Sequence, residues 1–203
     1  MTGAVVVRIW VGSLLACAAL VVCLFEYVDV PVAVHFWARS RHLSPLGETF
    51  GATILLSAES AVVLYLVIAR LVRGHISVLG RTVVIACLTS MCAYVVNDHV
   101  LKVACGVPGP ADVMRGARHS FNLWMGSEGS SFPSGHMALA AAFAGVFMRL
   151  HRASIGPFSA LLLLAAALLL LGDWHFLSDI VAGAFLGTTA GILAAEGWAA
   201  HSG

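Results

Sequence analysis

The chain has 203 residues, of which 60% are hydrophobic and only 10% are charged, and its mean hydropathy is +0.95. Soluble domains carry about 25% charged residues, so the composition excludes a soluble globular protein and predicts an integral membrane protein. The formal net charge is only +1, so the sequence lacks the excess of basic residues that is typical of nucleic-acid-binding proteins. We therefore expect no nucleic-acid partner.

Six stretches are apolar enough, and long enough or nearly so, to cross the hydrocarbon core as helices, which requires about 20 residues each. These stretches are residues 5–25, 51–73, 82–103, 135–150, 154–173 and 178–198. The first has Arg8 ahead of an apolar run, as a signal peptide does, but no convincing small-residue cleavage site follows, so we read it as a retained helix. Pro45 fits the first turn of the second helix. The pattern predicts an all-α fold, an integral membrane six-helix bundle with residues 1–203 as a single domain.

Charges at the helix ends predict the orientation of the bundle. Arginines flank two of the joints: Arg70, Arg73, Arg81, Arg149 and Arg152. Acidic residues gather on the opposite side: Glu26, Asp29, Glu48, Asp112, Glu128, Asp173 and Asp179. The positive-inside rule then places the arginine-flanked joints and both termini in the cytoplasm, although Arg39 and Arg41 fall on the other side. We expect the segment 104–133 and the joint 173–179 to share the outer face, which is the periplasmic face of a bacterial inner membrane.

Three polar clusters meet at that outer edge if the later helices alternate through the bilayer. They are Asn97, Asp98, His99 and Lys102; Ser134, Gly135 and His136; and Asp173, His175 and Asp179. A Ser-Gly pair at a helix start exposes backbone N–H groups at the positive end of the helix dipole, which is a ready anion site. Histidine adds a group that gives or takes a proton near neutral pH. The clusters together indicate phosphoryl chemistry at a bilayer surface.

Each cluster also has a purely structural interpretation. Lys102 would then extend into the lipid headgroups, paired with Asp98 one turn earlier. His136 would be an ordinary interfacial residue, and His175 with Asp179, four residues apart, a helix-capping pair. A single shared site explains why all three clusters occur at the same edge better than three independent structural roles do.

The residues in these clusters resemble the motifs of the type 2 phosphatidic acid phosphatase superfamily. Pro133-Ser134-Gly135-His136 is similar to its central motif, and His175 with Asp179 to the histidine and aspartate of its third motif. Lys102, followed eight residues later by Pro110, is similar to the ends of the first motif. The resemblance covers about residues 82–190, with the core motifs within 97–183.

Both arginines of the family motifs are missing from their usual places. Gly109 stands where the first motif has arginine before proline, and Leu168-Leu169 where the third motif has Ser-Arg. The run Trp174 to Asp179, followed by Ala182-Gly183, looks like a variant branch of the third motif. Lysine does not replace the planar, bidentate guanidinium one for one.

Arginines from the outer segment offer a replacement for the missing charge. Our hypothesis is that Arg118, together with Arg115, binds the substrate phosphate. The alternative is that both arginines only solvate a loop or meet lipid headgroups.

The resemblance also implies a mechanism. His175 would be the nucleophile and form a phosphohistidine, Asp179 would orient it, and His136 would be general acid and then base. The residues expected to hold the phosphate oxygens are Lys102, Ser134 and Gly135. We expect no metal and no other cofactor, because the site lacks a carboxylate cluster suited to magnesium. The five cysteines, four of them within apolar stretches, show no ligand spacing.

A membrane lipid-phosphate phosphatase, acting on a monoester or pyrophosphate, is therefore the leading interpretation. Its lipid partner would keep its tail in the bilayer, as phosphatidic acid, phosphatidylglycerol phosphate, polyprenyl (pyro)phosphates and lipid A phosphates do. A lipid phosphotransferase and a noncatalytic lipid-phosphate-binding relative are alternatives. The missing arginines favour the noncatalytic relative, whereas the intact motif residues argue against it: His136, His175, Asp179 and Lys102. A haem or metal protein using His99, His136 and His175 explains the histidines but not the Ser-Gly pair. The sequence leaves the oligomeric state open.

Two features lie outside the motifs. Glu59, within the second apolar stretch, is better explained by a packing hydrogen bond than by catalysis. The stretch 30–40 has the pattern of an interfacial amphipathic helix, with a plain connector as the alternative.

Overall fold

The computed structural model describes residues 3–40, 46–127 and 129–202, and these ranges contain helices and no β-strand. The elements are α1 (Gly3–Tyr27), α2 (Asp29–Ser40), α3 (Leu46–Arg73), α4 (Val78–Val96), the π-helix η1 (Asn97–Leu101), α5 (Lys102–Cys105), α6 (Pro110–Met114), α7 (Gly135–Leu150), the 3-10 helix η2 (Arg152–Ser154), α8 (Ile155–Leu171) and α9 (Leu177–Ser202). The all-α prediction is confirmed. The prediction for Pro45 falls outside the described residues.

Every apolar stretch of the sequence corresponds to a helix. Within the described residues, five helical segments are long and apolar enough to cross a membrane: 7–27, 51–73, 78–114, 152–171 and 177–201. The stretch 135–150 forms α7, which has 16 residues and is shorter than the others. These helices indicate a membrane protein.

Helix α7 lies against α9 at very short range. A Cβ atom on Gly187 would lie 2.2 Å from the carbonyl oxygen of Ala138, and one on Gly183 would lie 2.5 Å from that of Ser134. Gly183, Gly187 and Gly191 recur every four residues, so they share one face of α9. Small residues at this spacing let helix backbones approach closely within a membrane. The same contact places the start of α9 beside the start of α7.

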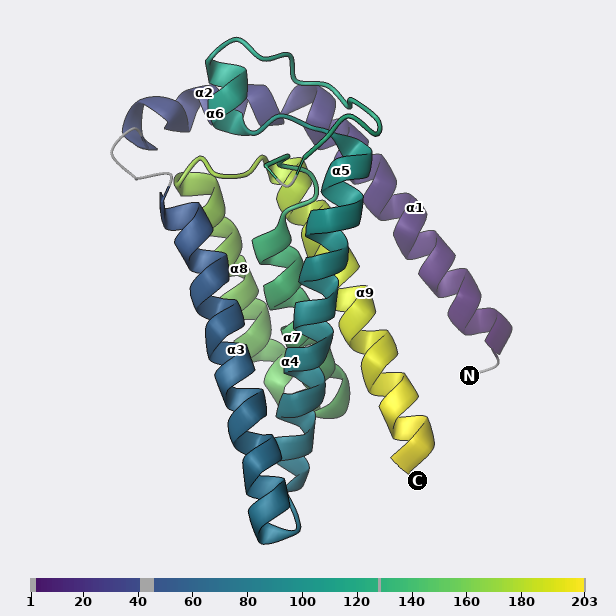
Figure 1. Ribbon diagram of the computed structural model, residues 1–203. Coiled ribbons are helices and arrows are strands. Elements are labelled where there is room, and N and C mark those ends of the chain that lie inside the picture. Colours follow the sequence, from purple (N-terminus) through teal and green to yellow (C-terminus); the bar gives the residue numbers. More distant parts are fainter. Residues whose placement is uncertain (1–2, 41–45, 128, 203) are drawn as a thin grey trace.

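One end of the bundle collects the segments that carry the motifs. Figure 1 shows the end of α4, the start of α7 and the joint between α8 and α9 at this end, while both chain termini lie towards the other. Helix α2 lies across the same end and contacts α6 and α8. The stretch 30–40 is thus helical, and its role at a membrane interface stays a prediction.

Glu59 is hydrogen-bonded within the bundle, as expected. The hydroxyl of Ser90, which is fully buried in α4, lies 2.9 Å from Glu59 Oε1 and 3.0 Å from the carbonyl oxygen of Leu139. This contact joins α3 and α4 to α7 in the apolar part of the protein.

Candidate functional site

The start of α7 has the geometry of an anion-binding helix terminus. Ser134 is the N-cap residue, and its hydroxyl oxygen accepts a hydrogen bond from the backbone N–H of Met137 at 3.3 Å. Other first-turn N–H groups, including that of Gly135, lie at the positive end of the helix dipole. A Cβ atom on Gly135 would lie 3.2 Å from the ring of Tyr94, so the close approach of α4 explains the glycine. The terminus suits a phosphate oxygen.

The segment that carries Lys102 packs against this terminus through a π-helical turn. The Asn97 side chain in η1 donates to the carbonyl oxygen of Pro133 at 2.9 Å, and the carbonyl of Asn97 accepts the backbone N–H of Lys102. Lys102 Nζ lies 2.6 Å from Asp98 Oδ1, and the two residues are only 8% and 9% exposed. The ammonium is therefore held inside the protein by an ion pair. Single π-turns are frequent at functional sites.

His175 and Asp179 lie at the joint between α8 and α9, and both are buried. Asp179 Oδ2 lies 3.6 Å from His175 Nδ1 and accepts the backbone N–H of Phe176 at 2.9 Å. The same oxygen accepts the hydroxyl of Ser131, whose Oγ is 3.3 Å from His175 Nδ1. A serine hydroxyl has one proton, and Ser131 donates it to the carboxylate. Ser131 therefore accepts from the imidazole, which assigns the imidazole proton to Nδ1.

The histidines of the two motifs face each other across a short gap. The ring centroids of His136 and His175 are 5.9 Å apart, with the rings edge-to-face at 63°. The backbone N–H of Ser134 donates to the carbonyl oxygen of Asp179 at 3.1 Å, which ties the start of α7 to the start of α9. The tertiary structure thus brings His136, His175 and Asp179 to the anion-binding end of α7. Two imidazoles at this separation can flank one phosphorus atom.

The metal alternative requires several ligand side chains close together. Across residues 3–40, 46–127 and 129–202, no group of three or more His, Cys, Asp or Glu side chains is arranged to hold a metal ion.

Comparison with known proteins agrees with this geometry. A family model, the PAP2 superfamily, matches residues 81–200, which include all the motif residues. The chain belongs to the PAP2 superfamily. No curated protein and no solved structure matches the chain. PAP2 superfamily members are in general phosphatases, so membership supports a hydrolase related to lipid phosphates.

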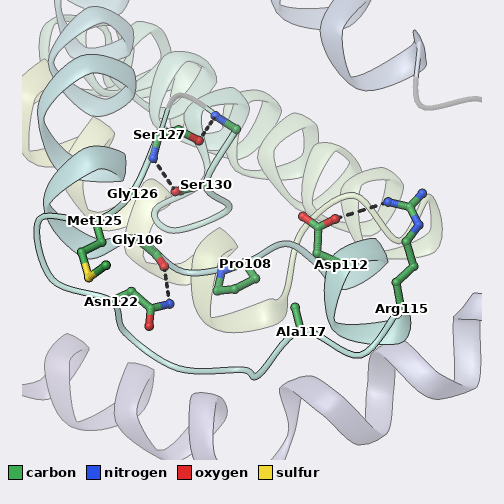
Figure 2. Close-up of a pocket in the computed structure, with 11 residues that line it drawn as sticks. Gly106, Pro108, Asp112, Arg115, Ala117, Asn122, Met125, Gly126, Ser127 and Ser130 are labelled. Atoms are coloured by element: carbon green, nitrogen blue, oxygen red, sulfur yellow. Dashed lines mark hydrogen bonds and ion pairs between the residues drawn. The ribbon is translucent and has the colours of Figure 1, made fainter.

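The outer loop of this PAP2 protein carries the two arginines of the replacement hypothesis. Arg115 Nη1 lies 3.3 Å from Asp112 Oδ1, and the Arg115 side chain is 66% exposed. Figure 2 shows this pair beside a cavity that the loop lines. The volume of this cavity is about 690 Å³. Arg118 is exposed, and its carbonyl accepts the hydroxyl of Ser120. A phosphate-binding role for either arginine stays a prediction.

Two consecutive serines connect the loop cavity to the pair His175 and Asp179. Ser130 lines the cavity and accepts the backbone N–H of Ser127 at 3.1 Å, as Figure 2 shows. The next residue, Ser131, donates its backbone N–H to the carbonyl oxygen of Val107 at 2.8 Å and its hydroxyl to Asp179. The backbone thus leads directly from the cavity lining to the residue that binds Asp179.

Sequence reasoning missed three residues that build this PAP2 site: Ser131, Asp29 and Gly51. Ser131 stands two residues before Pro133 of the central motif, so proximity in sequence was an available signal. Asn97 belongs to the first polar cluster of the sequence, but its hydrogen bond to Pro133 was not predicted. Asp29 and Gly51 lie before residue 81, outside the matched region, and no local pattern marks them.

Gly51 of α3 makes room for the imidazole of His136. A Cβ atom at position 51 would lie 3.3 Å from His136 Nε2, which is closer than ordinary van der Waals contact. We expect Gly51→Val to displace His136 and lower kcat by up to about 10²-fold, since a shift of about 1 Å in a catalytic group costs this much. Gly51→Ala should have a smaller effect of the same sign. Steady-state phosphate release measures both variants.

The matched control for this prediction is Gly12→Val. Gly12 lies in the apolar helix α1, and a Cβ atom there would meet nothing within 4 Å. We expect wild-type kcat from this control, and a wild-type kcat from Gly51→Val would contradict the seating of His136 against α3.

Asp29, at the start of α2, is a buried carboxylate whose pKa is raised. Burial raises the pKa of Asp29 to about 6 from 3.8, although hydrogen bonds from Ser178 lower it. The folded protein therefore holds this proton more tightly than the unfolded chain does. Its contribution to stability is full below the ordinary pKa and is lost as the pH rises through about 6.

We expect this loss to appear in thermal melting of the purified protein. Between about pH 5 and pH 7, the melting temperature of the wild type should fall relative to that of Asp29→Asn, which has no proton to lose. Burial also lowers the pKa of the neighbouring His119, so the contribution of His119 to stability changes with pH in the opposite direction. Both the wild type and Asp29→Asn retain His119, so the comparison between them is unaffected. Parallel melting curves across this range would contradict the raised pKa.

Proposed function

We propose that this protein is a membrane lipid-phosphate phosphatase that works through a phosphohistidine on His175. The observation that carries the proposal is the pairing of His175 with Ser131 and Asp179 opposite His136, at the capped end of α7. With the proton on Nδ1, the lone pair of Nε2 is the attacking position. A carboxylate near Nδ1 stabilises the positive charge that develops on the ring.

The reaction then has two steps. In the first, His175 Nε2 attacks phosphorus, the bond from phosphorus to the lipid oxygen breaks, and His136 protonates the leaving alkoxide. In the second, His136 takes a proton from water, the water oxygen attacks phosphorus, and the P–N bond breaks to release phosphate. Lys102, the Ser134 hydroxyl and the Gly135 N–H would hold the equatorial oxygens, whose charge positioned donors stabilise.

The position of the site favours an amphiphilic substrate. The motifs gather at one end of the apolar helices, so a lipid can keep its tail in the bilayer while its phosphate reaches the histidines. Both phosphate monoesters and pyrophosphates have a terminal phosphoryl group that fits this chemistry. By the arginine distribution, we propose that this end faces the periplasm of a bacterial inner membrane.

The experiment is phosphate release by the purified full-length protein from a panel of lipid phosphates, with and without EDTA. The panel contains phosphatidic acid, phosphatidylglycerol phosphate, a polyprenyl phosphate, a polyprenyl pyrophosphate and lipid A. We expect release from at least one lipid, unchanged by EDTA. Binding of these lipids without any release would favour the noncatalytic relative, and transfer of the label to an added alcohol in place of water would identify a phosphotransferase.

The arginine hypothesis makes a separate prediction for the same assay. We expect Arg118→Ala to raise KM for the lipid phosphate by about tenfold, which corresponds to the loss of one charge-assisted contact, and Arg115→Ala to have a smaller effect because Asp112 already pairs with it. Arg152→Ala, at the opposite end of the bundle, is the matched control. Wild-type KM and kcat in both Arg118→Ala and Arg115→Ala would contradict the hypothesis.

A further inference from the structure

The joint that carries His175 and Asp179 is held by a residue from outside the matched family region. Asp29, the first residue of α2, is 1% exposed and lies far from the joint in sequence. Asp29 Oδ1 accepts the backbone N–H of Ser178 at 3.0 Å, and Oδ2 accepts the hydroxyl of Ser178. Ser178 directly precedes Asp179, so both oxygens of Asp29 bind the residue next to the carboxylate that faces His175.

This contact supplies α9 with an N-terminal cap from another helix. The first N–H groups of a helix have no partner within the helix, and an anion near them is favourable. At the start of α9, the carboxylate of Asp179 takes the N–H of Phe176, and the carboxylate of Asp29 takes that of Ser178. The two N–H groups on either side of Leu177 are therefore held by two different carboxylates.

An aromatic stack ties the same joint to α1 and to the outer loop. The ring of His119 stacks on that of Phe25, with the ring centroids 4.0 Å apart. The ring of His119 also contacts that of Phe176, with the centroids 4.4 Å apart. His119 Nε2 lies 3.9 Å from Asp29 Oδ2. Phe176, the residue after His175, is thus packed against a histidine that itself lies against α1.

We propose that Asp29 is a positioning residue, which holds the α8–α9 joint so that Asp179 and Ser131 keep the Nδ1 proton of His175 in place. The proposal rests on the proposed function for its kinetic consequences. Asp29 touches no reacting atom. It acts through Ser178 on the orientation of Asp179, and the charged or titratable groups that face it are His119 and Asp179.

The first test is kinetic. In Asp29→Ala and Ser178→Ala, we expect kcat to fall by up to about 10²-fold, as for a catalytic group displaced by about 1 Å, with little change in KM. Asp29→Asn keeps an acceptor for the Ser178 N–H and should lose less. The double variant Asp29→Ala with Ser178→Ala should be no slower than the slower single variant, because both remove the same contact.

The matched control is Glu26→Gln. Glu26 is an exposed carboxylate one turn before Asp29, and its loss removes the same charge without touching the joint. We expect wild-type kcat from it, and melting curves of all variants verify folding. A wild-type kcat in folded Asp29→Ala, or an effect confined to KM, would overturn the proposal.

The second test does not depend on catalysis. Nitrogen-15 NMR of labelled protein reports which ring nitrogen of His175 carries the proton, and the signal is assigned by its absence in His175→Ala. We expect the His175 signals to move in Asp29→Asn and Ser178→Ala and to stay unchanged in Glu26→Gln. Unchanged signals in the first two variants would overturn the positioning role. A wild type that releases no phosphate from any lipid would overturn the proposed function alone.

Discussion

Replacement of His175 by alanine is expected to lower kcat/KM for phosphate release by about 10³-fold or more, because removal of a nucleophile eliminates the covalent route. The side chain is 2% exposed, and its Nδ1 is held by Ser131 beside Asp179. Only Nε2 is then oriented for attack. Initial rates on the best lipid of the panel measure the loss, and a melting curve verifies that the variant is folded.

A chemical trap distinguishes a nucleophile from a residue that only binds substrate. We expect wild-type protein, mixed with lipid labelled in the phosphate and quenched in alkali, to retain label that is lost on acid treatment, as a phosphohistidine would be. His175→Ala should retain none. His201→Ala is the matched control, since His201 is exposed and its Nδ1 lies 2.7 Å from a carbonyl oxygen of its own helix. Label in His175→Ala, or its loss in His201→Ala, would contradict the assignment.

Replacement of His136 by glutamine is expected to slow turnover of an alkyl phosphate lipid by about 10²–10⁴-fold, the usual contribution of general acid–base catalysis. The ring of His136 is 5.9 Å from that of His175, so it can reach the oxygens of a phosphate held between them. In the proposed mechanism, His136 first protonates an alkoxide, which is a poor leaving group. It then activates water for the second step.

A change of leaving group separates these two tasks. p-Nitrophenolate leaves without protonation, so we expect the variant to release one equivalent of p-nitrophenol from p-nitrophenyl phosphate in a rapid burst, followed by slow turnover. The burst reports phosphorylation of His175, and the slow phase reports hydrolysis without its base. Equal losses on both substrates, with no burst, would show that His136 does not act as the acid.

The helices and the motif residues could be predicted from the sequence because each is a property of a short segment. Hydropathy over 16 or more residues located α1, α3, α7 and the other long helices to within a few residues of their observed ends. A serine before glycine at the start of an apolar run marked the cap of α7, and a four-residue spacing marked His175 and Asp179. Neither inference needs a partner from elsewhere in the chain.

The detailed geometry of the site could not be predicted because it depends on contacts between distant segments. The π-turn that begins at Asn97 inserts an extra residue into the helix, and the pattern of apolar residues around it does not indicate this insertion. The Nδ1 proton of His175 is assigned by Ser131, which lies 44 residues away. Asn97 binds Pro133 and Ser131 binds His175, so both features depend on residues that are distant in sequence.

The sequence by itself determined that the protein is an all-α membrane protein with a Ser-Gly-His helix start and a His–Asp pair, since composition, period and spacing are local properties. The tertiary structure decided which further side chains complete the site: Ser131 on Asp179, Gly51 against His136, and Asp29 at the start of α9. The physical reason is the close backbone approach of α7 and α9 through glycine, which brings two helix starts together. The buried polar groups at those starts then take partners from whichever segments lie beside them.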